Sequence, residues 1–578
     1  MYIKTISQFG SSPSRRHVLY FAATVFTFLL IGYQFGTFDE GMHIPFLKFM
    51  ADPSLYPGDA MLSLNNVYYS YFWYSFIPFL RLGWLEPTLF SLHFVTIYIS
   101  FWAIWELSDT LFHNPLTSLL CTLAFIVPHF SFTGFPIFEF APLSRTFVLP
   151  FLLIAVNQFF KGRIPLAFFI SGLMYNIHVV SVNFILAMFG LACLLEFRRI
   201  GVKKIGSGAV LFILAAMPVL IWKSNGSPLD LSLRPEWVAL LNLTLFRHIF
   251  AMLGTYPGTW AATFGGFSAM ALFFIALKEE PASETSSVAR NFMLAGIIVV
   301  VVNIVTVNFF PVTIIIQSQI TRIGLWVLIL GYLYFSNYIV RIYEEKRLSP
   351  LAFATVLVAF VFSPTPILVL FVLWVLCTWQ KAMVVKLVAL LTGVTIVATF
   401  VIVWNLGFWN PGIYPYGQNT PWVQVQKWAK ANTPKEARFI TPPEKWAIQE
   451  SDWRVHSERS SAATLSELAV AAFQPGYEIE WKPRFELVAP GALAKYNGDY
   501  FNNIAITRQA YYSLTTEGLL NAACLLDAQY IVREKPYIHE LPLVYENEGF
   551  VVYDERGIAC KTLPCRPVSL TCSATLSQ

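Results

Sequence analysis

The sequence predicts a mainly α-helical, polytopic membrane protein with an extracytoplasmic α/β domain at its C-terminal end. Only 13% of the 578 residues are charged, which is about half the share found in soluble domains. Apolar runs long enough to cross roughly 30 Å of hydrocarbon recur throughout residues 1–406. Almost half of all the charged residues fall in residues 411–578. These three observations indicate a membrane module followed by a domain that lies in water.

The apolar runs predict about 13 transmembrane helices, several of them short or broken by proline. The expected spans are His17–Gly36, Thr88–Leu107, Leu116–Phe130, Leu143–Phe160, Pro165–Val179, Ser181–Phe197, Ala209–Trp222, Thr259–Leu277, Phe292–Phe310, Thr313–Val340, Leu351–Phe362, Ile367–Trp379 and Val384–Leu406.

The distribution of lysine and arginine in short loops predicts which way the helices run. Basic residues before the first span place the N-terminus in the cytoplasm, and the loops that return to that side are also basic. The residues that support this orientation are Lys4, Arg15, Arg16, Lys161, Arg163, Arg198, Arg199, Lys203, Lys204, Arg341, Lys346 and Arg347. We therefore expect an integral membrane protein with its C-terminal domain outside.

The same orientation requires Phe38–Pro87 to be one long external segment. Two short aromatic-rich runs within it, Met42–Met50 and Val67–Leu80, are typical of helices that lie in the membrane interface. The expected transmembrane module is thus residues 1–406, including the external loop 38–87.

Residues 411–578 are expected to form the compact α/β domain. The pattern predicts helices over Trp422–Ala431 and Thr515–Leu526. It predicts strands over Ala437–Thr441, Gln529–Arg533, Leu543–Glu546 and Phe550–Tyr553.

The seven cysteines divide between the two parts of the chain. Three lie in apolar spans, where they are most simply small fillers. Four lie in the expected external domain, where an oxidising compartment would allow a bridge such as Cys560 to Cys565, although spacing alone does not give the pairing. The external cysteines are Cys524, Cys560, Cys565 and Cys572.

Asp39 and Glu40 follow directly after the first span, where the bilayer meets water. Carboxylates in this position can remove a proton from a nucleophile or hold a divalent cation. Asp39 is equally a good N-cap for a helix that begins near Gly41. Spacing alone leaves both interpretations open.

Four further residues are candidates for binding a substrate. Glu139 lies in the next expected external loop, and Arg322 lies within an apolar span, where a charged group is costly. The arginine fork suits a pair of phosphate oxygens, but a neighbouring carboxylate could pair with it instead. Arg145 could reach the same anion or extend to the lipid headgroups, and His178 could bind a ligand or a backbone carbonyl.

The overall pattern resembles the GT-C superfamily of polytopic glycosyltransferases, which includes protein mannosyltransferases and aminoarabinose transferases. The resemblance rests on Asp39-Glu40 after the first span, the long external loop, about 13 spans and the C-terminal external domain. Short motifs are similar to those of an uncharacterised bacterial GT-C-like group. They are Asp52-Pro53-Ser54-Leu55-Tyr56 with Asp59, Ser457-Glu458-Arg459-Ser460 and Glu480-Trp481-Lys482-Pro483-Arg484.

The resemblance implies an enzyme of a bacterial inner membrane that moves a sugar from a polyprenyl-phosphate donor to a glycan, lipid or protein acceptor outside the membrane. It implies that Asp39, with Glu40 beside it, acts as the base or orients the acceptor. Arg322 and Arg145 would lie near the lipid phosphate, with Glu139 and His178 in the substrate site. No cofactor is certain; a divalent cation (Mg or Mn) would be held by Asp39 and Glu139.

Other classes of function are less well supported or excluded by the sequence. A net charge of +5 spread over the chain gives no basic patch for nucleic acid. A transporter of a lipid-linked or small anionic substrate would also explain many spans and an intramembrane arginine. A non-catalytic scaffold, or a polymerase or ligase that acts on lipid-linked sugars, are further alternatives.

Overall fold

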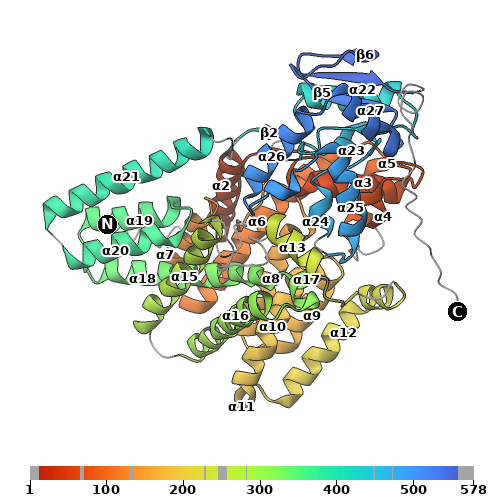
Figure 1. The fold of residues 1–578 in the computed structure, drawn as a ribbon. Coiled ribbons are helices and arrows are strands. Elements are labelled where there is room, and N and C mark those ends of the chain that lie inside the picture. Colours follow the sequence, from red (N-terminus) through yellow and green to blue (C-terminus); the bar gives the residue numbers. More distant parts are fainter. Residues whose placement is uncertain are drawn as a thin grey trace. The chain divides into compact units, whose positions relative to one another are not determined.

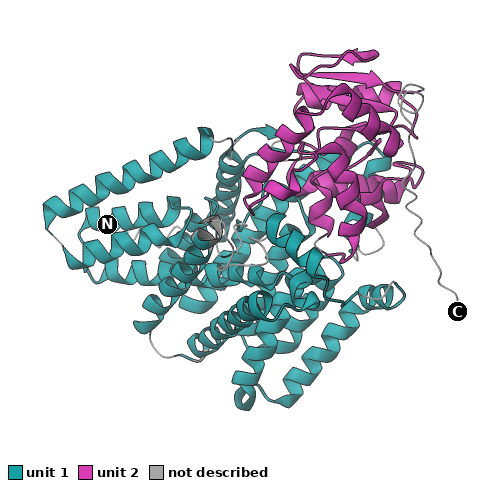
Figure 2. Ribbon diagram, in the orientation of Figure 1, with its two compact units in different colours: residues 1–35, 66–417 teal, residues 36–65, 418–578 magenta. Residues whose placement is uncertain are grey.

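The computed structural model describes residues 12–64, 70–130, 132, 136–226, 230–244, 257–280, 283–379, 381–405, 407, 409, 411–446, 450–471 and 473–556. The chain is predominantly helical, with its few strands concentrated near the C-terminal end (Figure 1). It forms two compact units, coloured separately in Figure 2. Unit 1 consists of residues 1–35 and 66–417, and unit 2 consists of residues 36–65 and 418–578.

Unit 1 contains the long apolar helices and one short pair of parallel strands, in which Tyr33 aligns with Ile413. Its elements are α2 (Pro13–Ile31), β1 (Tyr33–Gln34), η2 (Trp73–Phe76), α5 (Ile77–Arg81), α6 (Leu85–Phe112), α7 (Pro115–Ala124), α8 (Ser144–Phe160), α9 (Ile164–Tyr175), α10 (Val179–Leu195), α11 (Phe197–Ile200), α12 (Val202–Ser224), α13 (Pro235–Thr244), α15 (Pro257–Lys278), α16 (Glu284–Phe309), α17 (Thr313–Ser318), η3 (Ile320–Ile323), α18 (Gly324–Glu344), α19 (Pro350–Phe362), α20 (Pro366–Thr378), α21 (Ala382–Asn405) and β2 (Ile413–Tyr414).

Among the described residues, five helical stretches are long and apolar enough to cross a membrane, as expected for an integral membrane protein. They are Leu85–Phe112, Val202–Ser224, Thr285–Phe309, Thr313–Glu344 and Ala382–Asn405. Seven apolar helices of 10–17 residues accompany them. The expected total of about 13 spans stays a prediction, because these shorter helices do not by length alone establish a crossing.

Several of the expected spans differ from the observed helices. The run Leu116–Phe130 is helical only as far as Ala124, where α7 ends. The first helix, α2, ends at Ile31 and does not continue to Gly36, because residues 33–34 form strand β1. The run Thr313–Val340 is not one helix: Gln319 has a left-handed backbone with φ of 46°, and a 3-10 turn follows it. Non-helical backbone within a membrane needs protein or polar groups around it to satisfy its hydrogen bonds. Hydropathy does not reveal such a break, because the residues on both sides of it are apolar.

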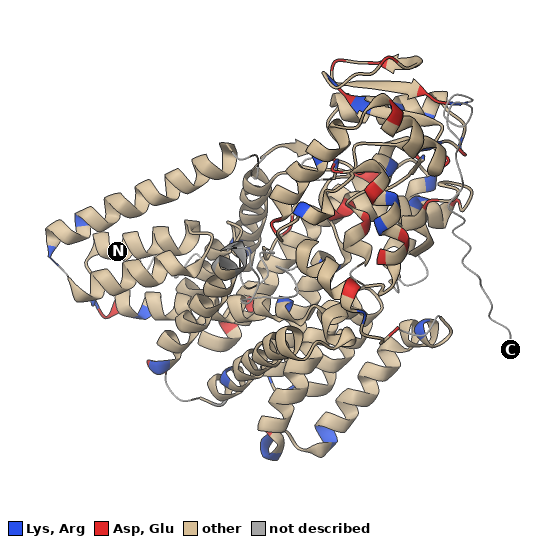
Figure 3. Cartoon of the chain, viewed as in Figure 1, with Lys and Arg blue, Asp and Glu red and all other residues tan. Residues whose placement is uncertain are grey.

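Charged side chains are unevenly distributed between the two units (Figure 3). In unit 1 they lie mainly near the ends of the long helices, whereas acidic and basic residues are interspersed throughout unit 2. This separation agrees with a membrane-embedded unit 1 and a unit 2 that lies in water.

Unit 2 is a mixed sheet covered by helices. Its elements are α3 (Phe38–Ala51), α4 (Ala60–Ser63), α22 (Pro421–Asn432), β3 (Arg438–Ile440), α23 (Trp453–Ser457), β4 (Ser460–Ser461), α24 (Glu467–Ala471), α25 (Tyr477–Val488), η4 (Leu493–Lys495), α26 (Tyr500–Tyr512), α27 (Thr516–Leu525), β5 (Tyr530–Glu534), β6 (Leu543–Glu546) and β7 (Phe550–Asp554). The strand order is β4-β3-β5-β7-β6. The first three strands are parallel, and β7 runs antiparallel to both β5 and β6.

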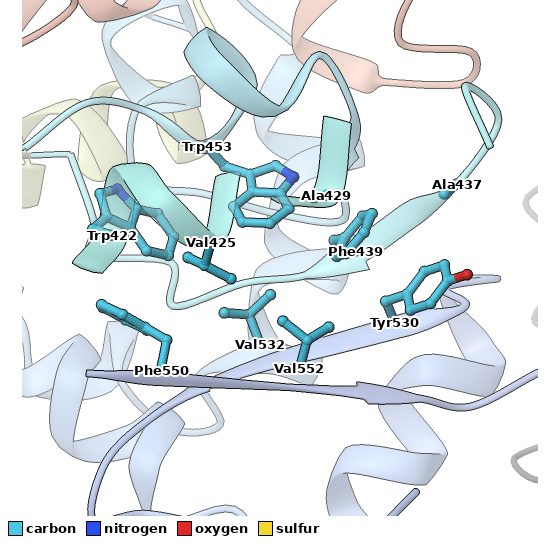
Figure 4. Packing of buried hydrophobic residues seen from close by; sticks show 10 residues of the cluster. All are labelled: Trp422, Val425, Ala429, Ala437, Phe439, Trp453, Tyr530, Val532, Phe550 and Val552. Carbon is cyan, nitrogen blue, oxygen red and sulfur yellow. The ribbon is translucent and has the colours of Figure 1, made fainter. Parts of the chain in front are cut away.

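One face of this sheet packs against α22 (Figure 4). Residues 422, 425 and 429 lie on one side of α22 because their spacing matches the helical period. Alternate residues of β5 and β7 meet them, since side chains alternate between the two faces of a strand. The buried cluster is Trp422, Val425, Ala429, Ala437, Phe439, Trp453, Tyr530, Val532, Phe550 and Val552.

The intervening strand residues Ile531 and Val551 are also buried. Both faces of the sheet are therefore covered, as is usual where parallel strands alternate with helices. The expected helices and strands of residues 411–556 correspond to α22, α27, β3, β5, β6 and β7. Helices α23 to α26 and strand β4 were not predicted.

The segment Gly36–Asn65 belongs to unit 2, although the sequence suggested an interfacial loop. Residues 40–47 of α3 are buried, and polar contacts join this helix to the C-terminal part of the unit. Trp446 Nε1 donates to the Phe38 carbonyl at 3.0 Å, and Lys48 Nζ lies 2.8 Å from Glu458 Oε1. Unit 2 is thus assembled from two stretches of chain that are separated in the sequence by residues 66–417 of unit 1. Part of the second expected interfacial run, Val67–Leu80, lies outside the described residues, and its remainder forms η2 and α5.

Candidate functional site

Unit 1 contains a pocket that brings together three of the predicted substrate-binding residues. Its volume is about 60 Å³, which is room for a small polar group. The residues that line it are Pro136, Ile137, Glu139, Arg145, Thr146, Leu149, Leu152, Ser181, Phe184, Arg322, Leu325 and Trp326. The charged lining is two arginines and one glutamate, so it carries one net positive charge. The remaining lining is mostly apolar.

Glu139 and Arg145 form a two-point ion pair within this pocket. Arg145 Nε lies 2.6 Å from Glu139 Oε1, and Arg145 Nη2 lies 2.5 Å from Glu139 Oε2. The expectation that Arg145 extends to lipid headgroups is therefore not met in the structure. Parallel bonds of this kind fix both side chains in one plane.

Two helix starts also contribute to the lining. Thr146 and Ser181 each stand at the third position of their helices, α8 and α10. The Thr146 hydroxyl accepts from the Leu143 N–H at 2.7 Å, which fixes the entry of the chain into α8. The starts of helices favour negative charge because their N–H groups are not used within the helix.

Arg322 lies in η3, next to the break at Gln319, and is half-buried. The sequence placed Arg322 in the middle of a continuous helix, and this is the part of the prediction that the structure corrects. The turn changes the direction of the backbone before α18, and Arg322 lines the pocket with Leu325 and Trp326. A charged side chain at a broken helix is a common way to place it at a ligand instead of in lipid.

His178 is the N-cap of α10 and is not among the residues that line the pocket. Its Nδ1 accepts a hydrogen bond from the Ser181 N–H at 3.1 Å and lies 2.8 Å from the Ser181 hydroxyl. The structure therefore gives His178 a capping role, and its hydrogen bonds to Ser181 link it to a residue of the pocket lining.

Asp39 and Glu40 lie in unit 2, at the start of α3. The helix begins at Phe38 with Thr37 at the N-cap, so the expected start near Gly41 is corrected. Glu40 is fully buried, and its Oε2 accepts from the Gly36 N–H at 2.9 Å. An acid at this position that reaches back to the preceding N–H groups is typical of capping. Asp39 is half-buried at the second position of the helix.

The candidates therefore fall into two groups: Glu139, Arg145 and Arg322 share the pocket of unit 1, and Asp39 with Glu40 share a helix start of unit 2. A chamber common to Asp39 and Arg322 stays a prediction, because these residues belong to different units. Among the described residues no group of three or more His, Cys, Asp or Glu is arranged to hold a metal ion. The predicted cation site at Asp39 and Glu139 likewise stays a prediction.

Unit 2 contains a buried network of ion pairs that was not predicted from the sequence. Arg454 is completely buried. Its Nε lies 2.7 Å from Asp59 Oδ2, and its other nitrogens lie 3.2 Å from Asp452 and 3.5 Å from Glu467. Arg484 Nη2 extends the network to Glu467 Oε2 at 2.7 Å. Asp59 and Arg484 both belong to the short motifs quoted above for the GT-C-like group, so those motifs were the available signal.

Cys524 forms a disulfide bond. Its partner lies outside the described residues, as does the bridge suggested between Cys560 and Cys565. Cys121, Cys193 and Cys377 are free thiols, as expected for small residues in apolar helices.

Glu444, which follows strand β3, is a second unpredicted feature of unit 2. It is 3% exposed, and burial raises the pKa of its carboxyl to about 7, although Lys445 and Arg508 partly offset the effect. An acid whose folded pKa is raised costs stability once it ionises. Its cost is absent below about pH 4.5 and grows as the pH rises through 7.

We expect Glu444→Gln to raise the melting temperature of the protein relative to wild type at pH 8 and to change it little at pH 5. The amide keeps the shape of the side chain but cannot ionise. Differential scanning fluorimetry across this pH range measures the effect, with Glu517→Gln on the exposed side of α27 as the matched control. An equal shift at both pH values would contradict the assignment.

No protein-family model matches the chain, and no curated protein matches it at a significant level.

Proposed function

We propose that this protein is a membrane glycosyltransferase of the GT-C type, which transfers a sugar from a polyprenyl-phosphate donor to an acceptor outside the membrane. The observation that carries the proposal is the pocket of unit 1, which Arg322 and Arg145 line together with apolar residues. A phosphate attached to an isoprenoid is complementary to such a pocket, because its anionic group suits the arginines and its apolar chain suits the apolar residues.

In this proposal Arg322 binds the donor phosphate. Glu139 holds Arg145 in place through their two-point ion pair, and Arg322 is the second arginine that lines the same pocket. The starts of α8 and α10 add partial positive charge. Stabilising the phosphate as it departs lowers the barrier to transfer, because negative charge develops on it when the bond to the sugar breaks. The apolar residues Leu149, Leu152 and Phe184 suit the adjoining isoprenoid units.

Asp39 is the proposed base that removes the proton of the acceptor hydroxyl. It is half-buried at the start of a helix in unit 2, so it is closer to water than the fully buried Glu40. A single direct displacement would invert the configuration at the anomeric carbon. The disulfide at Cys524 supports an extracytoplasmic location for unit 2, since such bonds persist in oxidising compartments.

Arg322→Gln tests the donor site directly. We expect this variant to bind a short-chain polyprenyl phosphate about tenfold or more weakly than wild type, because a hydrogen-bonded charge pair is lost. Microscale thermophoresis of the protein in detergent measures the affinity. Lys204→Gln, at an exposed position in the first turn of α12, is the control for a general loss of positive charge. Equal affinities of Arg322→Gln and wild type would refute the proposed phosphate site.

A transporter is the second candidate function, and the break between α17 and α18 favours it. Transporters commonly bind substrates where a membrane helix is interrupted. The two functions differ in their products, since a transferase releases free polyprenyl phosphate and a transporter leaves the donor intact. Thin-layer chromatography of a radiolabelled polyprenyl-phosphate sugar after incubation with the protein distinguishes them.

A further inference from the structure

The parallel strands of unit 2 have a topology at which ligands commonly bind in open α/β sheets. From β3 the chain passes to β4 on one side, and later returns to β5 on the other side of β3. Ligands bind preferentially where neighbouring parallel strands are connected in opposite directions, beyond their carboxyl ends. Here that position lies after Ile440 of β3 and Glu534 of β5.

The residues at this position form a mixed cluster of charge. Arg508 of α26 bridges the two strand ends, with Nη1 3.5 Å from Glu444 Oε1 and Nη2 2.5 Å from Glu534 Oε2. Lys445 Nζ lies 2.6 Å from Glu450 Oε1 and 3.6 Å from Glu534. Three acids meet two bases, so the cluster has no excess positive charge and does not suit a phosphate.

Two buried polar atoms in this cluster lack a hydrogen-bond partner among the described residues. They are Glu444 Oε2 and the Tyr512 hydroxyl oxygen, in residues that are 3% and 8% exposed. The two residues are close enough to interact electrostatically: burial and the Glu444 carboxylate together raise the pKa of Tyr512. A buried polar atom without a partner is costly, which favours a ligand that supplies hydroxyl groups.

Aromatic rings surround the same strand ends. The Arg508 guanidinium lies 4.9 Å from the centre of the Tyr512 ring. Trp446 packs edge-on against Tyr500 with 6.2 Å between ring centres, and the Tyr500 hydroxyl donates to the Trp446 carbonyl at 3.1 Å. Carboxylates that accept from hydroxyls, an arginine that donates, and flat apolar rings together match the chemistry of a neutral sugar.

A hydrogen bond also links the segment after β3 to the helix start that carries the proposed base. Trp446 Nε1 donates to the carbonyl of Phe38, the residue before Asp39. Both residues lie in unit 2, and this hydrogen bond holds the segment after β3 next to the start of α3.

We propose that the carboxyl ends of β3 and β5 form a binding site for a neutral, hydroxyl-rich sugar of the acceptor, with Glu444 accepting a sugar hydroxyl and Arg508 and Tyr512 flanking it. This proposal rests on the proposed transferase function and identifies its acceptor as a glycan. Glu444 and Tyr512 are binding residues here, and no chemical step is assigned to them.

The test is saturation-transfer difference NMR on the full-length protein in detergent, without any donor lipid. The probes are the methyl glycosides of glucose, galactose, mannose and N-acetylglucosamine. We expect at least one of them to give saturable transfer, and we expect both Glu444→Gln and Tyr512→Phe to weaken its binding by about tenfold. Glu517→Gln, with its exposed side chain, should bind as wild type does.

A purely structural Glu444 would behave differently, because Glu444→Gln would then change the melting temperature without changing sugar binding. Tyr512→Phe removes one oxygen only, so it keeps the test valid should Glu444→Gln fold poorly. The absence of saturable transfer from all four glycosides, or unchanged binding in both variants, would overturn the proposal. Because no donor is present, this failure is separate from a failure of Arg322 to bind polyprenyl phosphate.

Discussion

Replacing Arg454 by Met is expected to destabilise unit 2 by about 3–5 kcal/mol, because the change leaves buried carboxylates without their counter-ion. Arg454 has no exposed surface, and it contacts Asp59, Asp452 and Glu467. Methionine fills a similar volume but supplies no donor. Urea unfolding followed by tryptophan fluorescence measures the loss, since Trp453 is buried beside Arg454.

Arg556→Met is the matched control for this variant. Arg556 pairs with Asp554 at 2.6 Å, but its side chain is 57% exposed. Ion pairs of this exposure contribute about 0–1 kcal/mol. We further expect Asp59→Asn to recover part of the stability lost in Arg454→Met, because one unpaired charge is removed. A loss below about 1 kcal/mol in Arg454→Met would contradict the proposed importance of the network.

The network also has a direction of pH dependence. Burial alone would raise the pKa of Glu467, but Arg484 and Arg454 hold it below its ordinary value. For an acid with a lowered folded pKa, the stabilisation is complete above about pH 4.5 and is lost as the pH falls through the folded pKa. This trend is opposite to that of Glu444, whose cost appears as the pH rises.

Asp39→Asn is expected to lower the rate of sugar transfer by about 10²–10⁴-fold, the usual contribution of a general base. The amide keeps the size of the side chain but cannot accept the proton. Because Asp39 is half-buried, the melting temperature should remain near that of wild type. A radiolabelled polyprenyl-phosphate sugar and its acceptor, followed by separation of the product, give the rate.

Glu40→Gln is the informative comparison, since it changes the neighbouring acid in the same helix turn. Glu40 is fully buried and bonds to the Gly36 N–H at 2.9 Å, so its loss should reduce stability by about 1 kcal/mol. Transfer per folded molecule should persist in Glu40→Gln. Full turnover in Asp39→Asn, or equal loss of turnover in both variants, would refute Asp39 as the specific base.

The sequence predicted well where a local pattern determines structure. Hydrophobic runs gave a helical membrane protein, and the period of apolar residues located α22 and α27 to within a residue or two. Strands β5 and β7 were recognisable as short apolar runs of β-branched and aromatic residues, and turn residues separate β6 from β7.

The candidate site was only partly predictable for the same reason. Arg322 and Arg145 were identified because a charged group in an apolar span is costly, and Glu139 because it lies in the second expected external loop. All three line one pocket. The pairing of Glu139 with Arg145 could not be foreseen, since it depends on the path of the loop before α8. Neither could the turn at Gln319, because an apolar run reads the same whether its backbone is continuous or broken.

The sequence by itself therefore determined the solvent of each part: apolar runs require lipid or a protein interior, and the charge-rich end of the chain requires water. Only the tertiary structure decided that Gly36–Asn65 joins residues 418–578 in one unit. Its buried Asp59 finds Arg454 almost 400 positions further along the chain. Such a pairing leaves no local pattern in the sequence, because its partners come from distant segments. It depends on the tertiary structure, since a charge is buried at acceptable cost only beside an opposite one.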